Sequence, residues 1–192
     1  MYSVSETFLE KIMADDRSFA VKITLENSVE LTGTTIQDIT LDEIVNSAES
    51  LTMGCACSHK VTVNLINPPT NIDYNGVAFT VEVGLLMSDR PVTYEWLPLG
   101  RFYGADAETS NDFKNLKLTA YDGFCKMTEK YNATVSDSTT LKNVYADLKN
   151  QLYAQCGITL KELTMPEYSF AFPYLDITFQ QAIGYLAGCI GG

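Results

Sequence analysis

The residues with the clearest chemical potential form one short run, Cys55-Ala56-Cys57-Ser58-His59. On an extended strand alternate residues share one face, so two thiols and the chain's one histidine would line up about 6 to 7 Å apart, as ligands for zinc. Structural zinc sites, however, use a wider C-x₂₋₄-C spacing and a fourth ligand, and the other cysteines offer no such spacing. The favoured interpretation is structural, with both cysteines as small apolar residues on a strand.

Nucleophilic catalysis by this run is disfavoured on geometric grounds. A Cys/His pair needs a hydrogen bond, whereas residues two or four apart on one strand point in parallel. With one histidine in the chain, a serine triad cannot be assembled with confidence either.

Acidic residues offer two further kinds of chemistry. A glycosidase needs two carboxylates within about 5 to 9.5 Å, framed by aromatic residues, and Glu82 and Glu95 fit this requirement loosely. The pairs Asp15-Asp16 and Asp42-Glu43 fall at helix ends or turns, where solvated charge is the ordinary explanation.

A calcium loop is the other acidic alternative. It would use the acidic and amide side chains of one segment: Asp106, Glu108, Asn111 and Asp112. These lack the D-x-[DN]-x-[DN]-G order of a calcium-binding loop, so a solvated loop is favoured. The sequence therefore predicts no catalytic residue, no metal ligand and no cofactor.

Composition indicates a globular chain without a nucleic-acid or membrane partner. The chain has 192 residues, 46% hydrophobic and 19% charged, with a net charge of −11. Such acidity disfavours binding to nucleic acid or anionic lipid. Its five cysteines suggest synthesis in a reducing compartment, and its first residues lack the apolar core of a signal peptide.

Period-two patterns predict that residues 1–125 form a mainly antiparallel β barrel or sandwich preceded by a short helix. Ser3 and Glu6 resemble a capping box for that helix, which runs to Asp15. A hairpin turns at 26–28, and more strands are expected at 34–39, 50–53, 59–66, 77–86, 94–103 and 115–121. Aromatic residues on both faces of the 94–103 strand suggest a subunit contact or a second layer of the same chain: Tyr94, Trp96, Phe102 and Tyr103.

Residues 126–192 are expected to form a smaller α+β domain. Leu141, Val144, Tyr145, Leu148 and Leu152 mark one face of a helix that Gly157 ends. Short strands are expected at 158–163 and 168–172, and Thr178 with Gln181 caps a last amphipathic helix. Because that helix needs a partner surface, we expect this domain to be incomplete at its C-terminus and the chain to be a fragment of a longer protein.

The order of these segments resembles the tail-hub proteins of bacteriophages and prophages. In that family a W-x-P-x-G-x-F/Y strand precedes an I/L-T-A-Y-D strand, and a T-x-R/Q-Q-x-L/I-x-Y-x-A helix follows about sixty residues later. The matching segments are YEWLPLGRFY (94–103), NLKLTAYDGF (115–124) and TFQQAIGYLAG (178–188). The Cys55/Cys57/His59 run departs from the family, in which small or polar residues are expected there.

The resemblance implies a structural protein of the virion tail that is made in the bacterial cytoplasm. It implies a tube-related barrel, a homotrimeric ring that joins the tail tube or distal tail protein to a spike or lytic tip, and passage of DNA through a lumen without specific binding. Cell-wall hydrolase activity in such proteins belongs to a C-terminal region that this chain lacks, so no enzyme activity is expected here. The alternatives are a carbohydrate-binding β-sandwich that stacks sugars on Trp96 and Tyr94, and a glycoside hydrolase fragment that uses Glu82 or Glu95.

Overall fold

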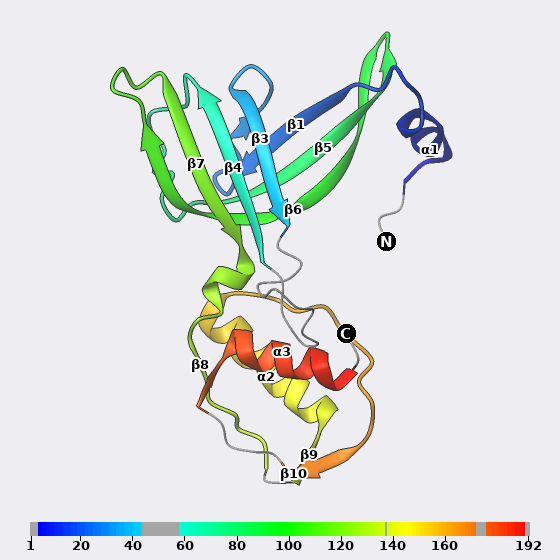
Figure 1. Ribbon diagram of the computed structural model, residues 1–192, viewed down its shortest axis with the longest axis vertical. Coiled ribbons are helices and arrows are strands. Elements are labelled where there is room, and N and C mark those ends of the chain that lie inside the picture. Colours follow the sequence, from blue (N-terminus) through cyan, green and yellow to red (C-terminus); the bar gives the residue numbers. More distant parts are fainter. Residues whose placement is uncertain (1–3, 44–57, 137, 172–175, 191–192) are drawn as a thin grey trace. The chain divides into compact units, whose positions relative to one another are not determined.

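The computed structural model describes residues 4–43, 58–136, 138–171 and 176–190 (Figure 1). It divides into one compact unit of Met1–Asp42 with Lys60–Asp122 and a second of Glu43–His59 with Gly123–Gly192. The described residues are mostly antiparallel sheet with three α-helices, so the chain is of the α+β class. The predicted strand at 50–53 and the cysteines Cys55 and Cys57, considered as zinc ligands but interpreted as structural, lie outside the described residues.

A seven-stranded sheet, in the order β2-β1-β5-β6-β7-β4-β3, makes up most of the first unit. Its strands are β1 (Phe19–Leu25), β2 (Glu30–Leu31), β3 (Ile36–Glu43), β4 (His59–Ile66), β5 (Ala78–Asp89), β6 (Val92–Thr109) and β7 (Asn115–Asp122). The described pairings of β1 with β2 and β5, of β6 with β5 and β7, and of β4 with β7 are all antiparallel.

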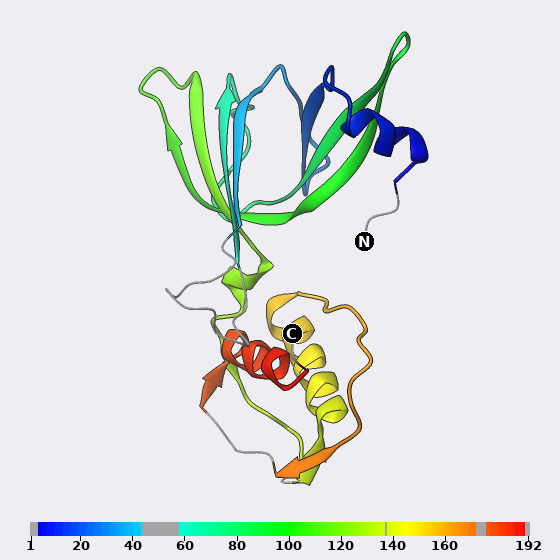
Figure 2. The same cartoon turned by 45° about the vertical axis from the view of Figure 1, so that its right-hand side comes forward.

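The sheet curves strongly around one face, as the two views in Figures 1 and 2 show. Its two edge strands are consecutive in the chain, since β2 ends at Leu31 and β3 begins at Ile36. A link this short holds the two edges close together at one end and favours a coiled sheet. No pairing between β2 and β3 is present in the described part of the chain, so a closed barrel stays a prediction.

The concave face of the sheet holds the core of the first unit. Burial alternates along β4 and β7, with Val61, Val63, Leu118 and Ala120 at most 1% exposed. Phe79 and Phe102 pack against each other in the same core, with ring centroids 6.1 Å apart. Period-two alternation in the sequence therefore identified the buried face correctly.

The link from β4 to β5 packs against β6 at a glycine. A Cβ added at Gly104 would lie 2.1 Å from the carbonyl oxygen of Tyr74. Backbone hydrogen bonds from Gly76 N–H to the Gly104 oxygen (2.7 Å) and from Gly104 N–H to the Val77 oxygen (2.9 Å) hold the two segments together. Only glycine allows this close approach.

Helix α1 (Glu6–Ile12) begins and ends differently from the prediction. Ser5 is its N-cap, because the Ser5 hydroxyl accepts a hydrogen bond from the Phe8 N–H, whereas the predicted cap, Ser3, lies outside the described residues. The helix stops at Ile12, short of Asp15. Phe8 is its one buried residue, so a single apolar side chain anchors this short helix.

The second unit contains α2 (Leu141–Cys156) and α3 (Phe179–Ile190) with two short strand pairs, β9 (Ser138–Thr140) with β10 (Ser169–Ala171) and β8 (Lys130–Tyr131) with β11 (Ile177–Thr178). A 3₁₀ turn, η1 (Gly123–Lys126), precedes them. The predicted face of α2 is buried, and Gly157 ends the helix with φ 67°. Thr178 and Gln181 exchange hydrogen bonds of 3.0 and 3.3 Å, which confirms the predicted capping box of α3.

The predicted strand at 158–163 is wrong, because no strand forms there. Ile158 and Leu160 do pack against the core of the second unit, so their alternation reflects contact with helices rather than pairing in a sheet. The Tyr145 hydroxyl donates a hydrogen bond to the Lys161 carbonyl and ties this irregular segment to α2.

Candidate functional site

The main candidate surface is an aromatic face on the outer side of β1, β5 and β6. Lys22, Glu82, Gly84 and Trp96 share this side, because the register pairs Lys22 with Glu82 and Gly84 with Trp96. Trp96 lies directly over Gly84, since a Cβ added there would be 2.8 Å from the indole. The indole is therefore half-buried on the side opposite the core, so of the two expected places for Trp96, the sheet core is excluded and a subunit contact stays a prediction.

A second aromatic ring and an ion pair hold the indole in place. Tyr94 lies 5.4 Å from Trp96 between ring centroids, and Lys22 Nζ lies 4.7 Å from the Trp96 ring. The same Lys22 Nζ is 2.7 Å from a Glu82 carboxylate oxygen. The ion pair neutralises the charges of Lys22 and Glu82, so this surface can stack on an apolar or aromatic group. Because both charges are paired, the two side chains offer neither a free acid nor a free base.

The 94–103 strand carries aromatic residues on both faces, as predicted. Phe102 is in the core at 1% exposure, whereas Tyr94 and Trp96 lie outside. Tyr103 is half-buried and contacts Arg101, whose guanidinium lies 5.7 Å from the ring. A strand with this distribution presents large rings to a surface that its own core does not cover.

The proposed glycosidase pair is wrong, because the two carboxylates project from opposite faces of the sheet. Glu82 shares the outer face with Gly84, while Glu95 pairs with Leu85 on the other face. Glu95 binds the start of α1 instead, accepting hydrogen bonds from the Ser5 N–H (2.8 Å) and the Ser5 hydroxyl (2.5 Å). These hydrogen bonds lower the pKa of Glu95 and leave it a structural carboxylate.

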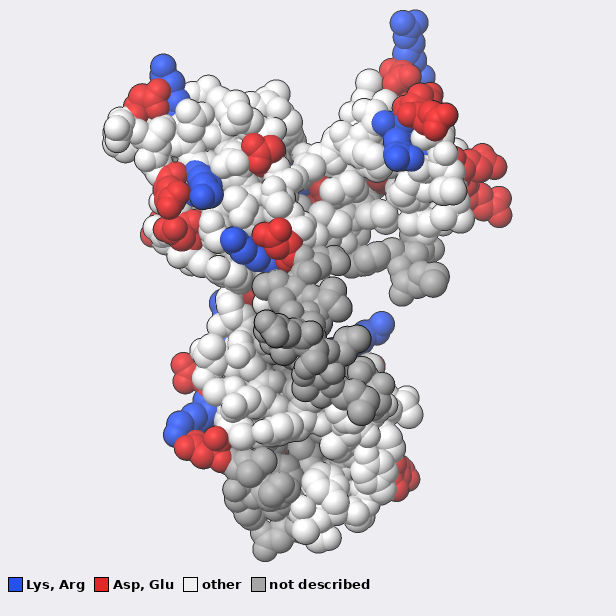
Figure 3. Space-filling view, in the orientation of Figure 1, with Lys and Arg blue, Asp and Glu red and all other residues white. Residues whose placement is uncertain are grey.

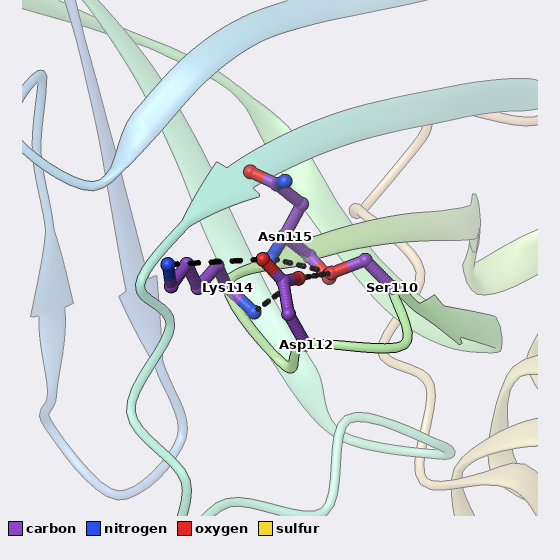
Figure 4. Close-up of polar contacts among 4 residues, drawn as sticks. All are labelled: Ser110, Asp112, Lys114 and Asn115. Carbon is purple, nitrogen blue, oxygen red and sulfur yellow. Dashed lines mark hydrogen bonds and ion pairs between the residues drawn. The ribbon is translucent and has the colours of Figure 1, made fainter.

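The segment considered as a calcium loop contains the hairpin turn between β6 and β7, whose polar groups hydrogen-bond to one another (Figure 4). The Asp112 carboxylate accepts hydrogen bonds from the Ser110 hydroxyl (2.7 Å) and the Lys114 N–H (3.2 Å), and these bonds lower its pKa. Glu108 lies 3.7 Å from Lys117 on the neighbouring strand. Local donors and Lys117 already engage Asp112 and Glu108, which favours the predicted solvated loop over the alternative Asp106/Glu108/Asn111/Asp112 calcium site.

No group of three His, Cys, Asp or Glu side chains within the described ranges could hold a metal ion. His59 begins β4, but Cys55 and Cys57, with which it was considered as a zinc-binding run, lie outside the described residues. The thiol of Cys156 donates a hydrogen bond of 3.2 Å to the Lys126 carbonyl, and burial raises its pKa. A protonated, hydrogen-bonded thiol of this kind is structural rather than reactive.

In the second unit a polar network centred on Asp147 was not predicted. Its carboxylate accepts hydrogen bonds from the Tyr131 hydroxyl (2.7 Å), from the N–H and hydroxyl of Thr134, and from Gln151 Nε2 (3.0 Å). Burial raises the pKa of Asp147, but these donors outweigh it and leave the pKa below its ordinary value. In the sequence, the signal for this network was the spacing of Asp147 and Gln151, which lie four residues apart on the predicted helix and can therefore contact each other.

An apolar pocket of about 440 Å³ also lies in the second unit. Its lining includes Leu141, Val144, Phe170, Ala182 and Leu186. The described lining carries neither a carboxylate nor an imidazole, and its polar groups are the hydroxyls of Tyr131 and Tyr185 and the thiol of Cys189.

Charges on the first unit are mixed in sign over the face that Figure 3 shows, where basic side chains lie beside acidic ones. Arg101 with Glu26, at 2.9 Å, is one such pair. The described residues on this face form no single-sign basic stripe of the kind that binds nucleic acid, in line with the net charge of −11. Among the described residues, no helix is both long and apolar enough to span a membrane.

Comparison with known proteins gives structural similarity at low sequence identity. No protein-family model matches the chain, and no curated protein matches it. The crystal structure of the 43 kDa tail protein of prophage MuSo2 from Shewanella oneidensis is similar to this chain, with a TM-score of 0.48 and 12% sequence identity. The match covers 88% of this chain and 49% of that protein, so the chain spans about half the length of the protein it resembles.

Proposed function

We propose that this chain is a structural, non-enzymatic component of a bacteriophage or prophage tail. In this proposal it is a hub or tail-tip protein, located in the virion tail, and three copies form a ring that joins the tail tube to a spike or lytic tip. DNA passes through the ring without specific binding, because an acidic chain repels phosphates. The proposal rests on the sequence motifs of tail hubs and on the positions of their residues in the fold.

The observation that carries the proposal is that these motif residues shape a sheet. Trp96 lies on Gly84 at the outer face, and Pro98 and Gly100 flank Leu99, which has no partner in the β5–β6 register. In the second motif, Leu118 and Ala120 are core residues. Residues of this kind control strand curvature and packing, as expected of an assembly module.

In this proposal the aromatic face is the surface for subunit contact in the ring. Tyr94, Trp96 and Tyr103 are half-buried within the chain and lie away from its core. Fixed aromatic rings lose little conformational entropy on binding and are enriched at protein interfaces. Copies of a chain with a net charge of −11 repel one another, so salt should favour their association.

Native mass measurement tests this assembly. At high protein concentration and moderate salt the wild type should contain a species of about three times the chain mass of 21.3 kDa. Trp96→Ala should abolish that species, whereas Tyr153→Ser, which changes a 65% exposed residue on α2, should retain it. A wild type that stays monomeric at every concentration, or a trimer that Trp96→Ala leaves intact, would count against the proposed ring contact.

A carbohydrate-binding module is the second candidate, because Trp96 and Tyr94 are half-exposed beside the polar pair Lys22 and Glu82. Trp96 is the only tryptophan of the chain, so its fluorescence reports sugar binding directly. Titration with hexoses, N-acetylglucosamine and its oligomers should leave the emission unchanged if the face is an assembly surface. A saturable change that Tyr94→Ala weakens would favour the sugar-binding function instead.

A further inference from the structure

The turn between β6 and β7 holds one phenylalanine in an unfavourable conformation. Phe113 has φ 56°, in the left-handed region, and is 71% exposed. The other non-glycine residues with positive φ in the described chain are Ser28 and Asn67, whose side chains are small or suited to turns. A bulky aromatic residue at this position costs folding free energy and recovers almost none by packing.

The turn around Phe113 is rigid, because its polar groups bond to one another. Phe113 N–H donates to the Ser110 carbonyl at 2.9 Å, and Ser110 N–H donates to the Asn115 carbonyl at 2.9 Å. The Asp112 carboxylate accepts from Ser110 and Lys114, as Figure 4 shows. Glycine or asparagine normally occupies the left-handed position of a turn of this kind. Placing the exposed ring of Phe113 there therefore lowers the stability of the fold.

Phe113 stands at the rim of a pocket in the same unit. The pocket has a volume of about 230 Å³ and lies between the turn and the link from β4 to β5. Its apolar lining consists of Pro68, Pro69, Ile72, Tyr74, Ala107 and Leu116. It is smaller than the roughly 300 to 1,000 Å³ of a typical small-molecule site, and its size suits one or two side chains.

The charge around this pocket indicates what kind of partner fits it. Asp73 is the one charged residue among the described lining, and no described ion pair joins it to a basic side chain. The chain as a whole carries a net charge of −11, so a basic segment is attracted both to Asp73 and to the protein as a whole. An apolar side chain on a basic segment would satisfy both the pocket and the charge.

We infer that Phe113 and this pocket form a docking site for another protein, which inserts an aromatic or large aliphatic side chain flanked by lysine or arginine. Phe113 then packs on the inserted side chain as the rigid anchor of the contact, and Asp73 pairs with the flanking cation. An exposed aromatic residue held in place before binding is typical of an interface hot spot. This site is separate from the aromatic face at Trp96 and does not depend on the proposed tail function.

Selection from a library of random displayed peptides tests the inference, with the purified chain as bait. The selected peptides should carry an aromatic or large aliphatic residue next to lysine or arginine. Phe113→Gly, which removes the ring and suits the left-handed backbone, should weaken their binding about tenfold or more, as expected for a hot spot. Asp73→Asn, which keeps the oxygen that accepts from Asn75 N–H at 3.0 Å, should weaken basic peptides several-fold.

Val92→Ser is the matched control, because Val92 is 63% exposed at the tip of the other long hairpin and should not affect binding. Amide NMR shifts on peptide addition should map to Tyr74 and Leu116. Several results would overturn the inference: failure to enrich any peptide, enrichment of acidic or wholly polar peptides, or equal losses from Phe113→Gly and Val92→Ser. Self-association of the wild type that Phe113→Gly removes would make a second copy the occupant and would also overturn it.

Discussion

At the scale of single residues, the missing side chain of Gly84 gives the outer face its shape. The six-membered ring of Trp96 occupies the space that a Cβ at this position would fill. Lys22 then lies close enough to the indole for a cation–π contact. One glycine therefore determines whether the only tryptophan of the chain can lie flat on the sheet.

Gly84→Ala should displace the indole and lower the free energy of unfolding by about 1 to 3 kcal/mol, the usual cost of overpacking. Trp96 emission should shift to longer wavelength and become more sensitive to acrylamide, because the ring moves into solvent. Gly33→Ala is the control, since no heavy atom lies within 4 Å of a Cβ added there. An unchanged spectrum and melting temperature in Gly84→Ala would refute this packing.

The Asp147 network predicts a pH dependence for the second unit. The native hydrogen bonds depress the pKa of Asp147 below the unfolded value of about 3.9. Its contribution to stability is therefore complete above that pH and is lost as the pH falls through the lower native pKa.

Asp147→Asn should destabilise the second unit by about 1 to 2 kcal/mol at neutral pH and flatten its loss of stability below about pH 4. Circular dichroism at the helix band reports mainly this unit, because α2 and α3 have 16 and 12 residues against 7 in α1. Asp176→Asn, which removes an exposed partner of Lys130, should have little effect. An equally steep acid transition in Asp147→Asn would contradict the role given to this carboxylate.

At the scale of elements, α1 is attached to the long β5–β6 hairpin at few points. Phe8 is its buried side chain, and the Glu95 carboxylate accepts two hydrogen bonds from the N-cap residue Ser5. A helix of seven residues is not stable alone, so these contacts decide whether it forms.

Ser5→Ala removes both the N-cap and one bond to Glu95, and should cost about 1 to 2 kcal/mol. Hydrogen exchange should accelerate at the α1 amides while exchange in β4 and β7 stays slow. Ser18→Ala, just before β1, provides a serine control outside the helix. Equal protection of α1 in wild type and Ser5→Ala would contradict a role for the Ser5 hydroxyl in holding the helix.

Much of this fold could be predicted from local patterns. The buried faces of β4, β7 and α2 follow from periodicity, and Gly157 and the Thr178–Gln181 box mark helix ends by chemistry that acts over a few residues. The features that could not be predicted depend on the register between paired strands. The turn at Arg90-Pro91 and the register shift between Leu86 and Ser88 decide that Glu82 and Glu95 face opposite sides of the sheet, and no local pattern specifies either.

The candidate surfaces were predictable only in part. The aromatic content of the 94–103 strand was visible in the sequence, but the placement of Trp96 outside the core depends on which neighbour lies across from it. The role of Phe113 could not be predicted, because nothing in the sequence shows that its backbone is left-handed. The Asp147 network joins residues that are far apart in the chain.

At the scale of the whole molecule, each unit has its own hydrophobic core and its own spectroscopic signal of folding. Trp96 reports on the first unit, and the two long helices report on the second. The proposed function places these units in a larger assembly, where the outer sheet face meets neighbouring subunits and the acidic charge keeps DNA from adhering.

Immunogold electron microscopy of phage particles produced by the organism that encodes this chain tests the central proposal most directly. Antibodies against the chain should place gold at the end of the tail that lies away from the capsid, and a strain lacking the gene should give particles with no label and no complete tail tip. Label on the capsid, or tails that assemble fully without the chain, would contradict a structural role at the tail hub.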